Sequence, residues 1–107
     1  MADFVRVARI TDIPSDSARV FTVRGRRLAL CHVDGTIYAV DDTCTHDGGP
    51  LGEGRLDNHA IECPRHGARF DVRTGAVVQM PAVFPIRTYP TRIENGEIAV
   101  DLGDGAV

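Results

Sequence analysis

The sequence has no run of apolar residues long enough to cross a membrane, which takes about 20 such residues. Its first residues alternate and include an early acid, unlike the apolar region of a secretory signal. The net charge of −3 is too small to favour nucleic acid or an anionic membrane as a partner. We therefore expect a cytoplasmic protein that binds neither.

Cysteine is also scarce, with 3 in 107 residues. Three thiols cannot all pair with one another, and a chain without a secretory signal is expected in a reducing compartment, where disulfides are rare. This argues against a secreted disulfide scaffold and leaves the cysteines to bind metal or to fill a core. For Cys31, in an apolar run between Leu30 and His32, a core thiol is the better interpretation.

No window of ten or more residues has the amphipathic pattern of a helix. Alternation and short β-branched runs instead predict strands at residues 4–8, 19–23, 27–33, 36–40, 60–63, 69–72, 87–93 and 97–102. Asp34-Gly35 and Asn95-Gly96 are hairpin signals, and Pro90 places its strand at a sheet edge or a bulge. The chain is therefore predicted to be a single all-β domain, a small antiparallel sandwich or barrel.

One region, residues 41–84, departs from this regular strand pattern. Its expected strands are short, and its glycines and prolines are dense. Loops of such composition fold tightly around something or carry function. Two motifs lie in this region, Cys44-Thr45-His46 and Cys63-Pro64-Arg65-His66, with residues 47–62 between them.

Three interpretations of these two cysteines and two histidines compete. Chance is the weakest, because two loops of such composition are improbable by accident. Two thiolates and two imidazoles suit tetrahedral zinc, although zinc motifs usually present a cysteine pair and then a histidine pair. In a Rieske 2Fe–2S cluster, two cysteines hold one iron and two histidines hold the other. Two similar loops, each giving one ligand to each iron, meet that requirement best.

The paired motif resembles that of the Rieske ferredoxin family. The resemblance extends to the strand pattern, to the turn at residues 73–75 and to the closing hairpin. It implies one Rieske-type 2Fe–2S cluster bound through Cys44, His46, Cys63 and His66. It also implies a cluster-binding subdomain of about residues 41–84, inserted into a base of about residues 1–40 and 85–103.

The residues around the motif narrow this resemblance. Respiratory Rieske subunits carry an extra cysteine in each ligand loop and two hydroxyl donors to sulfur after the second histidine. This chain has Gly49 and Arg65 at the first two positions and Ala68 and Phe70 at the others. The bridging disulfide is therefore excluded. Without the donors, we expect a potential toward the low end of the Rieske range, about −150 mV.

The resemblance is strongest to the ferredoxin component of bacterial ring-hydroxylating dioxygenase systems. It implies a monomeric one-electron carrier between a flavin-dependent NAD(P)H reductase and a terminal Rieske oxygenase, with no catalytic residues of its own. A Rieske-like small subunit of assimilatory nitrite reductase is the alternative. An oxygenase fragment would need a site of two histidines and a carboxylate, and His32 and His59 lie in no such cluster.

Charged residues crowd both ligand loops. The first loop contains Asp41, Asp42, Asp47 and Glu53, and the second contains Arg65 and Arg69. We expect these side chains to form a solvated face; the alternative is that they orient docking to redox partners.

Overall fold

The computed structural model describes residues 4–44, 49–52, 54–64, 67–80 and 84–103. In chain order its elements are β1 (Phe4–Arg9), the 3-10 turn η1 (Ile10–Asp12), β2 (Ser17–Val23), β3 (Arg26–Val33), β4 (Thr36–Asp41), β5 (Leu56–Asp57), β6 (Ala60–Glu62), β7 (Arg69–Asp71), β8 (Val77–Gln79), β9 (Thr88–Tyr89), β10 (Thr91–Glu94) and β11 (Glu97–Asp101). No helix in the described part of the chain is long and apolar enough to cross a bilayer.

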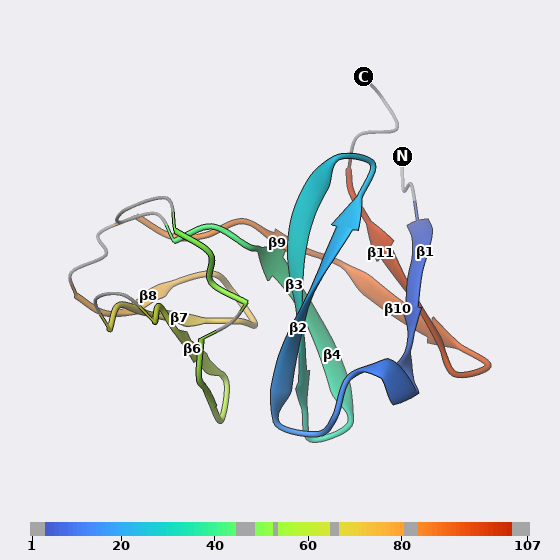
Figure 1. Ribbon diagram of the computed structural model, residues 1–107, viewed down its shortest axis with the longest axis horizontal. Helices are drawn as coiled ribbons and strands as arrows, with labels where there is room; N and C mark the ends of the chain where they lie inside the picture. Colours follow the sequence, from blue (N-terminus) through green and yellow to red (C-terminus); the bar gives the residue numbers. More distant parts are fainter. Residues whose placement is uncertain (1–3, 45–48, 53, 65–66, 81–83, 104–107) are drawn as a thin grey trace.

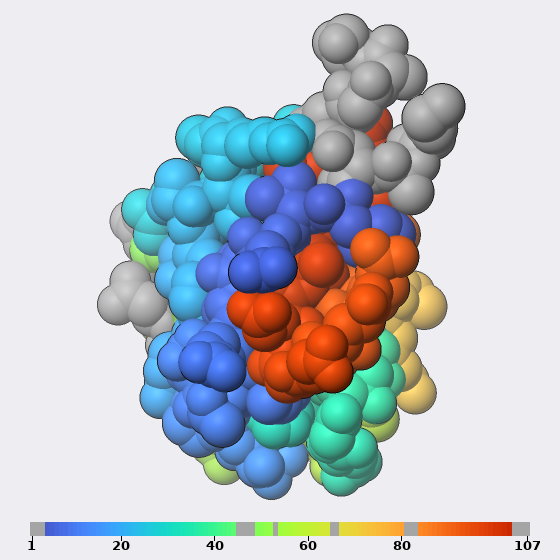
Figure 2. Space-filling model, turned by 90° about the vertical axis from the view of Figure 1, so that its right-hand side faces the viewer, coloured from blue at the N-terminus to red at the C-terminus, as the bar shows by residue number. Residues whose placement is uncertain are grey.

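The strands form three antiparallel sheets, with the orders β1-β11-β10, β2-β3-β4-β9 and β5-β6-β7-β8. The second sheet lies between the other two (Figure 1). Figure 2 shows the face formed by the first sheet, where β1 (blue) lies beside the hairpin of β10 and β11 (orange to red). The predicted all-β, antiparallel fold is confirmed. The boundaries of a base and a cluster-binding subdomain stay a prediction.

The middle sheet is buried on both faces, and β3 shows how its sequence allows this. Side chains of a strand point alternately to opposite faces. Leu28 and Leu30 accordingly belong to the core shared with the first sheet, whereas Ala29 and Cys31 belong to the core shared with the third. All four are fully buried. A continuous apolar run therefore places one strand between two cores.

Two-residue turns connect the hairpins. Asp34-Gly35 and Asn95-Gly96 both have positive φ at both positions, as a type I′ turn requires. Arg24-Gly25 adopts the same conformation between β2 and β3, although arginine gave no turn signal in the sequence. The two predicted hairpins are confirmed.

Pro90 divides the strand predicted at residues 87–93 into β9 and β10. β9 pairs with β4 and β10 pairs with β11, so the chain changes sheets at the proline. Proline has no N–H to donate to a ladder, so no hydrogen bond from its backbone is lost where the chain changes sheets. The predicted edge position is confirmed, since both pieces lie at sheet edges, but the single strand was wrong. The short strands β5 and β8 had no signal in the sequence.

Candidate metal centre

The structure brings two of the four predicted ligands into one core. Cys44 follows β4 and Cys63 follows β6, and both are fully buried in the core between the second and third sheets. Neither forms a disulfide. Ala68 and Phe70 are fully buried in the same core, so the side chains at these positions offer no hydroxyl to a sulfur nearby. Two thiols outside any disulfide, in an apolar setting, suit a soft metal such as the iron of a cluster.

Backbone hydrogen bonds shape the first ligand loop. The N–H of Cys44 donates to the carbonyl of Gly49 at 2.9 Å, which joins the two described ends of this loop. Outside this bond, the Asp42 carboxylate accepts a hydrogen bond from the N–H of Leu51 at 2.9 Å and another from the N–H of Gly52. The loop is therefore closed twice at its base.

The expectation that Asp42 belongs to a solvated face was wrong. Its exposed fraction is 3%. The reason is that its oxygens satisfy backbone N–H groups and a guanidinium inside the fold. Asp41 is half-buried, and its carboxylate accepts a hydrogen bond from the hydroxyl of Tyr89.

The second ligand loop is closed in a similar way. The N–H of Cys63 donates to the carbonyl of Ala68 at 2.7 Å, and the N–H of Gly67 donates to the carbonyl of Cys63 at 3.0 Å. At the loop's base, Arg69 pairs with Glu62, with its Nε 3.0 Å from Oε1. The amide of Gln79 adds a hydrogen bond to the carbonyl of Gly67 at 3.2 Å. This hydrogen bond of Gln79 was not predicted from the sequence.

The structure describes only some of the other residues singled out in the sequence. His46 and His66 lie outside the described residues, as do Arg65, Asp47 and Glu53. Cys31 is fully buried on β3, which confirms the core interpretation, and burial raises the pKa of its thiol to about 12. His32 is half-buried, and its Nδ1 donates to the carbonyl of Ile13 at 2.8 Å. The half-buried His59 packs edge-on against Tyr38, with ring centres 5.8 Å apart.

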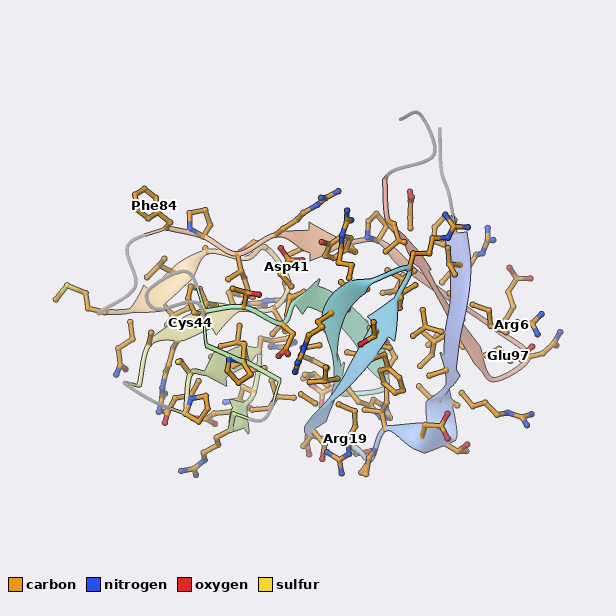
Figure 3. The ribbon with its side chains drawn as sticks, turned by 45° about the horizontal axis from the view of Figure 1, so that its top comes forward. Arg6, Arg19, Asp41, Cys44, Phe84 and Glu97 are labelled. Carbon is orange, nitrogen blue, oxygen red and sulfur yellow. The ribbon has the colours of Figure 1, made fainter. Side chains whose placement is uncertain are left out.

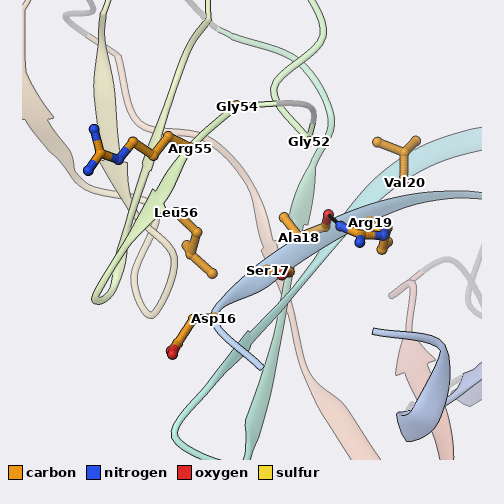
Figure 4. A pocket seen from close by; sticks show the side chains of 9 residues that line it. All are labelled: Asp16, Ser17, Ala18, Arg19, Val20, Gly52, Gly54, Arg55 and Leu56. Atoms are coloured by element: carbon orange, nitrogen blue, oxygen red, sulfur yellow. Dashed lines mark hydrogen bonds between the residues drawn. The ribbon is translucent and has the colours of Figure 1, made fainter. Parts of the chain in front are cut away.

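A cleft of about 480 Å³ lies between β2 and a segment that includes Gly52 and residues 54–56 (Figure 4). Among the described residues that line it are the exposed Arg19 and Arg55, with no cysteine or histidine. The described lining of this cleft therefore offers no thiol or imidazole to a metal.

The two closed loops and their shared buried thiols match a known family. A model of the Rieske [2Fe-2S] domain matches residues 3–90. The chain belongs to the Rieske 2Fe–2S family. As the sequence predicts, it is a protein with one Rieske-type cluster.

Similar proteins indicate the branch of this family. The ferredoxin component of the naphthalene 1,2-dioxygenase system of Pseudomonas putida is 40% identical over 99 residues, which are 92% of this chain and 95% of that protein. The ferredoxin of carbazole 1,9a-dioxygenase from Nocardioides aromaticivorans IC177 has a TM-score of 0.89 and 33% identity, covering 94% of this chain and 98% of the other. The predicted electron carrier of the ferredoxin type is confirmed.

Two further solved structures bear on the partner. A complex of reduced oxygenase and oxidized ferredoxin in carbazole 1,9a-dioxygenase matches with a TM-score of 0.86 and 34% identity, covering 92% of both chains. A small subunit described as a putative nitrite reductase matches with a TM-score of 0.81 but only 15% identity, covering 92% of this chain and 97% of the other. That second likeness shows the fold alone.

Proposed function

We propose that Cys44, His46, Cys63 and His66 hold the cluster, and that the chain carries single electrons from a flavin-dependent NAD(P)H reductase to a terminal aromatic-ring-hydroxylating oxygenase. The observation that carries the ligand assignment is the burial of Cys44 and Cys63 in one core, at the ends of two loops that close in the same way. When bound, the cluster accepts and releases one electron at a time.

The chain's own residues prepare this site. The apolar side chains around the two thiols exclude water, which protects thiolates bound to iron from protonation and exchange. Hydrogen bonds from Cys44 to Gly49 and from Cys63 to Ala68 fix the backbone that carries each thiol. A fixed backbone keeps the ligand geometry the same in both redox states, which favours rapid electron transfer.

Exposed apolar side chains support docking at the same end of the molecule. Met80 is 76% exposed just after β8, and Phe84 is 66% exposed. Phe84 and Cys44 lie toward the same end in Figure 3, away from Arg6 and Glu97. Large exposed apolar side chains mark contact surfaces, and transient redox complexes need only a small one. The ferredoxin–oxygenase complex among the similar structures supports an oxygenase as the partner.

We place the protein in the cytoplasm as a monomer, where a reductase that uses NAD(P)H would find its cofactor. The ring-hydroxylating system is preferred over assimilatory nitrite reductase. The ferredoxin relatives are similar in sequence over nearly their whole length, whereas the nitrite reductase likeness is limited to the fold.

The ligand assignment is tested by iron and sulfide analysis of cysteine variants. We expect two irons and two labile sulfides per chain in the natural protein, and loss of both in Cys44→Ser and Cys63→Ser. Cys31→Ala is the matched control, because Cys31 is equally buried in that core but lies on β3. Full iron in Cys44→Ser would refute the assignment, and zinc without sulfide would refute the cluster.

The carrier role is tested by NADH-driven reduction of a purified terminal Rieske oxygenase through its flavin reductase and this protein. Phe84→Asp is expected to slow reduction without altering the visible spectrum. Ile93→Asp is the control, since Ile93 is 42% exposed on β10, in another sheet. Equal rates for both variants would refute the docking surface, and no reduction by the natural protein would count against the oxygenase partner.

A further inference from the structure

Asp42 is the one buried polar or charged residue in the described part of the chain. A buried carboxylate is costly unless hydrogen bonds and an opposite charge stabilise it. Here Oδ1 accepts from the N–H groups of Leu51 and Gly52. Oδ2 lies 3.1 Å from Nε and 2.9 Å from Nη2 of Arg27. All four donors converge on one side chain two residues before Cys44.

These bonds connect three parts of the chain at the base of the first ligand loop. Asp42 directly follows β4 and Arg27 lies on β3. Leu51 and Gly52 follow the loop. The backbone joins them too, because Asp42 donates to the carbonyl of Arg27 at 3.1 Å. The segment that contains Cys44 therefore leaves and returns at a fixed point of the middle sheet.

Gly52 permits this close approach. A Cβ at this position would lie 2.3 Å from Cγ2 of Val20 and 3.0 Å from Oδ1 of Asp42. A side chain at this position would displace the Val20 side chain or the backbone of residue 52, and it would crowd the carboxylate. The glycine thus serves the seating of Asp42, with no need for an unusual φ.

The pair also places two opposite charges near Cys44, which lies two residues along the chain from Asp42. The Asp42 side chain is fully buried, while the Arg27 side chain is 58% exposed. The positive charge of Arg27 compensates the negative charge of Asp42, but water partly screens the charge of Arg27. Breaking the pair on either side would leave an uncompensated charge close to Cys44.

We propose that Asp42 is a positioning residue for the Cys44 loop, and that its pairing with Arg27 tunes the reduction potential of the centre. The proposal rests on the assignment of Cys44 as a ligand. Adding an electron is easier beside a positive charge and harder beside a negative one. Asp42→Asn leaves Arg27 unpaired and raises the midpoint potential. Arg27→Gln leaves Asp42 unpaired and lowers it, by a smaller amount because Arg27 is the more exposed partner.

The experiment is protein-film voltammetry of Asp42→Asn, Arg27→Gln and the double variant, each with full iron content. We expect shifts of opposite sign in the two single variants, and in the double variant a rise smaller than that of Asp42→Asn, since the two unequal shifts partly offset each other. Arg27→Lys keeps the charge and is expected to keep the natural potential. Asp42→Asn is also expected to lose iron to a chelator about tenfold faster, because a charge-assisted closure of the loop is weakened.

Arg6→Gln and Glu97→Gln are the matched controls. This pair has its Nη1 and Oε2 atoms 3.3 Å apart, toward the other end of the molecule from Cys44 (Figure 3). We expect no shift from either. Shifts of the same sign at Asp42 and Arg27, no shift at all, or an equal shift in Arg6→Gln would overturn the proposal. If Asp42→Asn does not fold, the midpoint potentials of Arg27→Gln and Arg27→Lys are compared. A lower potential in Arg27→Gln than in Arg27→Lys supports the proposal, and equal potentials overturn it.

A failure of the ligand assignment would be seen separately. Full iron in Cys44→Ser counts against the assignment, whereas wrong signs in iron-replete Asp42 and Arg27 variants count against the tuning pair alone.

Discussion

Replacement of Gly54 by alanine tests whether the backbone beside the second ligand loop is as closely packed as the structure shows. A Cβ on residue 54 would lie 1.7 Å from the carbonyl oxygen of Glu62 and 3.0 Å from that of Leu51. The two segments would have to separate by roughly 1.5 Å to restore an ordinary contact distance. Glu62 immediately precedes Cys63, so the displacement would reach the ligand loop directly.

The expected cost has two parts. Forcing an extra methyl group into a closely packed site costs about 1–3 kcal/mol. The separation also weakens the 2.8 Å bond from the N–H of Glu62 to the carbonyl of Arg55, which contributes about 1 kcal/mol. We therefore expect Gly54→Ala to destabilise the protein by about 2–4 kcal/mol. For a domain of this size, that lowers the thermal midpoint by roughly 10–20 °C.

The assay is thermal unfolding of the cluster-loaded protein, followed by circular dichroism at one scan rate, together with iron content. Gly35→Ala is the control, because a Cβ there would meet nothing within 4 Å. It carries only the backbone cost of a positive φ, about 1 kcal/mol, and is expected to keep its iron. A change below about 0.5 kcal/mol in Gly54→Ala, or equal iron loss in both variants, would refute the reasoning.

Three further predictions concern ionisation and potential. Because Ala68 and Phe70 offer no hydroxyl, we expect protein-film voltammetry at neutral pH to give a midpoint near −150 mV, and a value above about +100 mV would contradict this. Burial, with a smaller effect of the Asp41 carboxylate, raises the pKa of Tyr89 from 10.0 to about 12. The folded protein therefore holds this proton more tightly than the unfolded chain. The contribution of this proton to stability is complete below pH 10 and is lost toward pH 12. The free energy of unfolding should therefore fall over that range, and it should fall less steeply in Tyr89→Phe. With a pKa raised to about 12, Cys31 should resist iodoacetamide in the native protein at pH 8, and rapid labelling detected by mass spectrometry would contradict its core role.

Much of the fold could be predicted from the sequence, because the controlling patterns are local. Alternation placed the main strands, and the dipeptides Asp34-Gly35 and Asn95-Gly96 placed two hairpins. The strand prediction failed where the pairing of a segment depends on its place in the fold and not on its local pattern. The run at residues 87–93 looks like one strand, yet its two halves find partners in different sheets. β5 and β8 are too short to give a periodic signal, and they exist through their pairing with β6 and β7.

The candidate site divides in the same way. The sequence by itself determined the family and the paired motif of Cys44, His46, Cys63 and His66, since ligand type and spacing are properties of the chain. Only the tertiary structure decided that Asp42 is a buried anchor and that Gln79 reaches Gly67. A side chain's burial and hydrogen-bond partners depend on segments distant in the chain, such as Arg27 on β3, and no local pattern encodes where those segments arrive.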